Sequence, residues 1–149
     1  MKFSPLFWPI ELKGKFISIL DETKLPSKVS YIKVRDYKGS CRAIKEMKTR
    51  AVGQVLLVFY TFLLEAKKIK RNKNILPVLQ KVAKAINATR PTLSFKFMTD
   101  MVLGWVATGK PLEQSILGFL EMLKGRRIKQ AEEASKLILD GDTILTHCN

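Results

Sequence analysis

Residues 51–64 form the longest apolar stretch of the chain, and apolar side chains occur on every face of its helical projection. Val55 and Phe59 fall on one side at the helical period of about 3.6 residues, while Leu57 falls on another. A helix without a polar face has to be surrounded by other elements, so we predict that residues 52–69 form the central helix of a bundle. The stretch is shorter than the about 20 apolar residues that cross a bilayer, and we expect no membrane partner.

Four other segments have a helical period. One begins near residue 39, where Ser40 can cap it, and another has Asn74 as its cap. The last two begin at Pro91, running to about residue 107, and at Pro111, because proline suits the first position of a helix. We therefore expect about five helices.

The ends of the chain have extended patterns instead. Two apolar runs in residues 9–23 surround the turn Lys13-Gly14-Lys15, which predicts a β-hairpin, and residues 31–37 add another extended piece. The last ten residues predict a tight turn that feeds a short apolar strand without a partner. The fold class is therefore mostly α, with a small N-terminal β-hairpin, about five bundled helices and one C-terminal strand. The boundaries are a β-rich entry segment (1–38), a helical domain (39–140) and the terminal strand (141–149) of a larger protein.

Positive charge is the outlier of the composition. The chain has 27 Lys and Arg against 13 Asp and Glu, a net charge of +14, which attracts phosphates, nucleic acid or an acidic protein surface. Residues 65–90 hold eight basic residues and the single acid Glu65, but no exposed aromatic residues alternate with them, so nucleic acid is not expected as a partner. Cys41 and Cys148 stand alone, which predicts no metal site, no cofactor, no disulfide and a cytoplasmic location.

Three residues are candidates for chemistry. Arg50 stands before the long apolar helix and Arg90 stands before Pro91, so each guanidinium can meet the free N–H groups of a helix start and bind phosphate. The alternative for both arginines is a surface residue at a helix junction. Cys148, in the terminal strand, can act as a nucleophile or as an acid and base, or simply as a small apolar residue. His147 faces the opposite side of that strand, so no Cys–His pair is predicted.

Four segments stand in an order that resembles a known family. They are Ile-Leu-Asp-Glu-Thr-Lys-Leu-Pro at 19–26, Ala-Ile-Lys-Glu-Met-Lys-Thr-Arg at 43–50, Thr-Arg-Pro-Thr at 89–92 and Gly-Asp-Thr-Ile-Leu-Thr-His-Cys-Asn at 141–149. This order resembles the N-terminal part of the methylthioribose-1-phosphate isomerases, which are related to the regulatory subunits of translation initiation factor 2B. The resemblance spans nearly the whole chain.

The resemblance implies a helical domain that precedes a Rossmann-like domain, with residues 141–149 as the first strand of the latter, and a homodimer built through that second domain. The implied reaction converts an aldose 1-phosphate, a phosphorylated pentose, to the ketose 1-phosphate. Arg50 and Arg90 would hold the phosphate and Cys148 would be one half of the acid/base pair. The other half, an aspartate, would lie beyond residue 149, so we predict that this chain alone is inactive.

One departure leaves the substrate open. The family reads Arg-Gly-Ala-Pro-Ala-Ile-Gly at the first phosphate loop, whereas this chain has Arg50-Ala51-Val52-Gly53-Gln54. A 5-deoxyribose-1-phosphate or ribose-1,5-bisphosphate isomerase is therefore an alternative. A second alternative is an initiation-factor-2B-like regulatory or scaffold subunit that acts through protein contacts. A basic nucleic-acid-binding domain would leave Cys148 unexplained.

Overall fold

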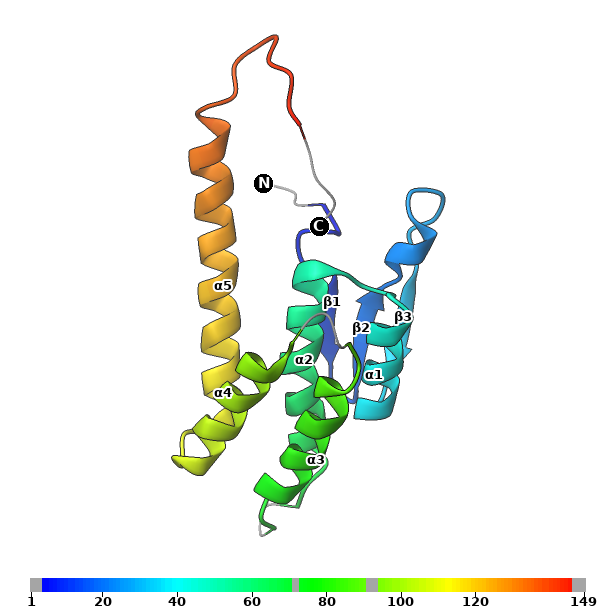
Figure 1. Cartoon of the computed structure of the whole chain (residues 1–149), viewed down its shortest axis with the longest axis vertical. Coiled ribbons are helices and arrows are strands. Elements are labelled where there is room, and N and C mark those ends of the chain that lie inside the picture. The colour runs from blue at the N-terminus through cyan, green and yellow to red at the C-terminus, as the bar shows by residue number, and fades with distance from the viewer. Residues whose placement is uncertain (1–3, 71–72, 91–93, 146–149) are drawn as a thin grey trace.

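A small antiparallel sheet and five helices make up the parts of the chain that we describe, residues 4–70, 73–90 and 94–145 of a computed structural model (Figure 1). The strands come first in the chain, and the helices follow. The order agrees with the predicted mostly α architecture. No helix in the described ranges is long and apolar enough to cross a membrane.

The sheet contains β1 (Ile10–Lys13), β2 (Phe16–Leu20) and β3 (Tyr31–Val34) in the order β1-β2-β3, and both pairs are antiparallel. Gly14 has a φ of 58° in the turn between β1 and β2, a conformation that glycine adopts without steric cost. The predicted hairpin is confirmed. The additional extended piece is also confirmed, because it forms β3 and adds a third strand beside β2.

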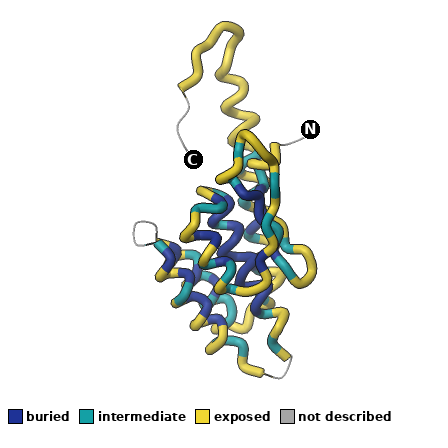
Figure 2. The backbone as a smooth tube through the Cα atoms, turned by 90° about the vertical axis from the view of Figure 1, so that its right-hand side faces the viewer, coloured by how far each residue is buried: buried dark blue, intermediate teal, exposed yellow. Residues whose placement is uncertain are grey.

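The central helix is α2 (Ala51–Ala66), which packs against the other four helices and against β1 and β2. Phe59 and Phe62 in this helix are fully buried, and the Phe59 ring lies 4.8 Å from that of Phe119 in α5, centroid to centroid. Figure 2 shows the buried residues gathered along the middle of the bundle. The prediction of a surrounded apolar helix is confirmed.

The remaining helices are α1 (Tyr37–Lys45), α3 (Leu76–Asn87), α4 (Lys96–Ala107) and α5 (Leu112–Ser135). Most of their predicted positions hold, but the predicted starts of α1 and α4 were wrong. In α3 the N-cap is Ile75 and not the predicted Asn74, although Asn74 Oδ1 accepts a hydrogen bond from the Leu76 amide at 3.1 Å.

Ser40 does not cap α1, because the helix begins three residues earlier. Asp36 is the cap, and its Oδ1 accepts a hydrogen bond from the Gly39 amide at 2.8 Å. Ser40 is instead buried inside the helix, where its hydroxyl accepts a hydrogen bond from Thr61 Oγ1 of α2 at 2.7 Å. A residue suited to capping is thus used for contact between two helices.

The fourth helix begins at Lys96 and not at the predicted Pro91, because Ser94 and Phe95 are outside any helix. Pro91 itself lies outside the described residues. Phe95 is the buried N-cap of α4, and the Met98 and Thr99 amides donate to its carbonyl at 3.0 Å. Burial of this aromatic residue therefore marks the helix start.

The C-terminal part of α5 extends beyond the bundle, and residues 131–145 are exposed (Figures 1 and 2). Residues 141–145 form a turn and irregular backbone and no strand. The remainder of the predicted terminal strand, residues 146–149, lies outside the described residues. Apolar side chains such as Leu137, Leu139 and Leu145 are exposed on this segment.

Candidate functional site

The loop between α1 and α2 has an unusual backbone conformation. Met47 and Ala51, at its two ends, have φ values of 53° and 39°, which residues with a Cβ rarely adopt. Glu22, which follows β2, fixes the loop between them. Its Oε1 accepts hydrogen bonds from Thr49 Oγ1 at 2.7 Å and from the Arg50 amide at 3.0 Å, and its own amide donates to the Lys48 carbonyl at 2.9 Å. The loop is therefore held by contacts from a segment far away in the chain.

Asp21, the residue before Glu22, supports the same loop. Its carboxylate is buried, accepts hydrogen bonds from the Thr23 hydroxyl and amide, and lies 3.6 Å from Lys48 Nζ and 3.9 Å from Lys24 Nζ. The Thr23 hydroxyl is the largest influence and lowers the pKa of Asp21, with help from the two ammonium groups, although burial opposes the shift. A charged carboxylate is therefore a fixed part of this structure at neutral pH.

Gly53 allows α2 to begin directly against this loop. A Cβ at this position would lie 1.8 Å from Thr49 Oγ1 and 3.2 Å from Pro9 Cγ. Both distances are shorter than ordinary van der Waals contacts, so no larger residue fits without rotation of the Thr49 side chain or movement of the loop. The absence of a side chain here sets where the first turn of α2 lies.

Gln54 connects Arg90 to the start of α2. The Gln54 side chain is buried, and its Nε2 donates to the Thr49 carbonyl at 3.0 Å. Its Oε1 accepts a hydrogen bond from Arg90 Nη1 at 3.2 Å. Arg50 is the exposed N-cap residue of the same helix. The structure therefore brings Arg90 to the helix end that Arg50 caps, although the two residues are far apart in sequence.

A cavity of about 330 Å³ lies against the first residues of α2. Ala51 and Val52 line it from α2, Phe7 lines it from the N-terminal segment, and Arg127 and Gln130 line it from α5. The Arg127 guanidinium lies 5.1 Å from the centre of the Phe7 ring. The first N–H groups of a helix have no partner within that helix, and with the positive end of its dipole they attract anions.

Sequence reasoning missed Arg127 because no motif surrounds it. Its only signal was its position in a basic part of α5, and packing of α5 beside α2 brings it to the cavity.

Cys148 lies outside the described residues, so its predicted role stays a prediction. Cys41 is half-buried on α1, where it packs against the core, and burial raises the pKa of its thiol. Within the described ranges, no three His, Cys, Asp or Glu side chains form a metal-binding group.

Comparison with known proteins gives no matching family model. The chain is 32% identical to methylthioribose-1-phosphate isomerase from Pelotomaculum thermopropionicum, over 89% of this chain and 40% of that protein. It is 33% identical to methylthioribose-1-phosphate isomerase from Dehalococcoides mccartyi, over 94% of this chain and 46% of that protein. The chain thus spans less than half the length of these relatives.

Two solved structures have a similar fold. The crystal structure of 5-methylthioribose 1-phosphate isomerase from Pyrococcus horikoshii has a TM-score of 0.62 at 19% identity and covers 85% of this chain and 38% of that chain. Subunit delta of translation initiation factor 2B from A. fulgidus has a TM-score of 0.67 at 22% identity and covers 95% of this chain and 45% of that chain. The resemblance of this chain to the N-terminal part of the methylthioribose-1-phosphate isomerases is confirmed.

Proposed function

We propose that this chain supplies the phosphate-binding half of an aldose–ketose isomerase that acts on methylthioribose 1-phosphate, in methionine salvage. The observation that carries the proposal is the hydrogen bond from Arg90 to Gln54, because it brings a second guanidinium to the helix start that Arg50 caps. Arginine binds phosphate through parallel N–H donors, and a helix start adds backbone N–H groups. A cavity of about 330 Å³, of a size for one small sugar phosphate, lies beside the first residues of α2, although Arg50, Arg90 and Gln54 are not among the residues that line it.

The remaining chemistry of the proposed enzyme requires groups outside the described residues. An aldose-to-ketose conversion moves a proton between neighbouring carbons, which needs an acid and a base in place. We assign one of these roles to Cys148 and the other to an aspartate from a second domain. The proposal includes a cytoplasmic homodimer as the complete enzyme, and it predicts no isomerisation by this chain alone. In a complete protein, Cys148→Ser should abolish turnover, and unchanged turnover would remove Cys148 from the mechanism.

Phosphate binding tests the proposal on the chain itself. Ribose 1-phosphate and inorganic phosphate are titrated into the protein while the arginine side-chain NMR signals are followed. Arg50→Gln and Arg90→Gln should each weaken binding roughly tenfold to a hundredfold, because a hydrogen bond to a charged group contributes about 1.5–3 kcal/mol. Arg35→Gln, on an exposed arginine that follows β3, is the matched control and should bind like the unchanged protein.

Equal losses in all three variants would mean general charge attraction, and unaffected binding would mean that phosphate binds elsewhere. Either outcome refutes the proposed site. Substrate choice is tested in the complete protein with methylthioribose 1-phosphate, 5-deoxyribose 1-phosphate and ribose 1,5-bisphosphate. If the protein turns over 5-deoxyribose 1-phosphate or ribose 1,5-bisphosphate in preference to methylthioribose 1-phosphate, the preferred sugar becomes the assigned substrate.

A further inference from the structure

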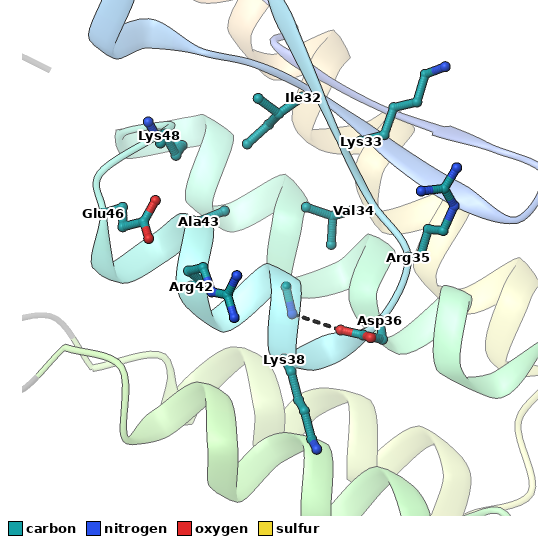
Figure 3. A pocket seen from close by; sticks show the side chains of 11 residues that line it. Ile32, Lys33, Val34, Arg35, Asp36, Lys38, Arg42, Ala43, Glu46 and Lys48 are labelled. Atoms are coloured by element: carbon teal, nitrogen blue, oxygen red, sulfur yellow. Dashed lines mark hydrogen bonds between the residues drawn. The ribbon is translucent and has the colours of Figure 1, made fainter.

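A second hollow, of about 430 Å³, lies between β3 and α1 (Figure 3). Its floor is apolar: Figure 3 shows Ile32 and Val34 directed from β3 toward α1, where Ala43 faces them. We call this hollow the β3–α1 groove. It shares no lining residue with the cavity at the start of α2.

Positive charge surrounds the groove. Five of its lining residues are cationic, namely Lys33, Arg35, Lys38, Arg42 and Lys48, and two are acidic, namely Asp36 and Glu46. The Asp36 carboxylate is already used to cap α1 through the Gly39 amide. The groove therefore has an excess of positive charge that favours an acidic ligand.

One side of the groove is an edge strand. The sheet order β1-β2-β3 leaves β3 paired with β2 alone among the described strands. The other edge of such a strand offers backbone N–H and C=O groups to an added strand. Successive side chains of an added strand alternate in direction, so one set would face the apolar floor and the other would face Lys33 and Arg35, which point to the opposite side of β3 in Figure 3.

The charge and lining of the groove narrow the choice of occupant. A second copy of this chain also carries a net charge of +14, and its own basic β3 would be repelled. Single-stranded nucleic acid is favoured by aromatic side chains that stack with bases, and no aromatic residue lines this groove in the described ranges. An acidic peptide fits both the charge and the free strand edge.

We propose that the β3–α1 groove binds an acidic peptide segment of a partner protein, which adds to β3 as a fourth strand. Its carboxylates pair with Lys33 and Arg35, and its alternate aliphatic side chains cover Ile32 and Val34. This interaction does not depend on the proposed isomerase function, because it uses a different surface.

The test uses a fluorescein-labelled peptide of alternating glutamate and valine, and anisotropy measures its binding to the whole chain at moderate salt. The double variant Lys33→Glu/Arg35→Glu should bind at least about tenfold more weakly. The double variant Lys81→Glu/Lys84→Glu changes the net charge equally at exposed positions on α3 and should bind within about twofold of the unchanged protein. Circular dichroism verifies that both variants fold.

Backbone pairing needs a second measurement. Bound peptide should slow amide hydrogen exchange in β3 and not in β1, and N-methylation of alternate peptide amides should remove binding. Equal losses in the two charge variants, or unchanged exchange in β3, would overturn the proposal. Tighter binding of an RNA of equal charge, with the same loss in Lys33→Glu/Arg35→Glu, would overturn it in favour of nucleic acid. Phosphate binding at the start of α2 should persist in this variant, which separates the two proposals.

Discussion

Gly53→Ala is the substitution whose effect the structure defines most sharply. The added methyl group would lie 1.8 Å from Thr49 Oγ1, 3.1 Å from Thr49 Cβ and 3.2 Å from Pro9 Cγ. Rotation of the Thr49 side chain would relieve the first contact and leave the other two. It would also break the 2.7 Å hydrogen bond from Thr49 to Glu22, which holds the loop in place. The substitution therefore costs either a hydrogen bond or a movement of the loop.

The free energy of unfolding should fall by about 1.5–5 kcal/mol. The hydrogen bond to the charged Glu22 contributes about 1.5–3 kcal/mol, and the crowding that remains costs about 1–3 kcal/mol. Replacement of glycine by alanine inside a helix returns about 1 kcal/mol. For a domain of this size the net loss lowers the Tm by roughly 3–20 °C.

Urea unfolding, followed by circular dichroism at the helix signal, measures the change. Gly104→Ala in α4 is the matched control, because nothing lies within 4 Å of the added methyl group, and it should gain up to about 1 kcal/mol. In the Thr49→Ala background, Gly53→Ala should cost much less than it does alone, because the clashing hydroxyl is gone. Equal stability of Gly53→Ala and Gly104→Ala would refute the packing argument.

Two further predictions concern the same loop. Because the pKa of Asp21 is lowered from its ordinary value of 3.8, its charge stabilises the fold at and above about pH 5, and this contribution is lost as the pH falls through the lower folded-state pKa. Asp21→Asn should therefore flatten the fall of the urea midpoint on acidification, and an unchanged slope would contradict this. Ala51→Gly should raise the free energy of unfolding by up to about 1 kcal/mol, because a φ of 39° strains a residue with a Cβ. A measured loss would show that the alanine side chain stabilises the loop.

The elements that were predicted correctly are those that residues close together in the sequence determine. The turn at Gly14 and the long apolar stretch of α2 are visible in sequence because each depends on neighbouring residues. The starts of α1 and α4 were misplaced because contacts across the fold decide them: Ser40 contacts Thr61, and Phe95 is buried. Preferences for capping residues are weak compared with such burial.

The candidate site was predicted only in part for the same reason. Arg50 and Arg90 lie in recognisable segments, and the position of Arg50 at a helix start was visible from sequence. The predicted position of Arg90 at a helix start was wrong, because α4 begins at Lys96. The link between the two arginines was not visible, because Gln54 reads as an interruption of an apolar helix until its contacts with Thr49 and Arg90 are known. Arg127 had no local signal, since it reaches the cavity through the packing of α5 beside α2.

The role of Glu22 can be decided by the sign of one measured change. The Glu22 carboxylate accepts a hydrogen bond from the Arg50 amide, so it lies beside the proposed phosphate site. Simple electrostatics therefore predicts that Glu22→Ala removes a charge that repels phosphate, and that phosphate binding becomes stronger. If Glu22 instead positions the loop, the loss of its bonds to Thr49 and Arg50 frees the backbone at the start of α2 and weakens binding. We expect the weaker binding, because the left-handed residues at both ends of the loop persist only when surrounding contacts hold them. Thr49→Ala removes one of the two bonds without a change of charge, so a smaller loss in the same direction would assign the effect to position, whereas stronger binding in Glu22→Ala would assign it to charge.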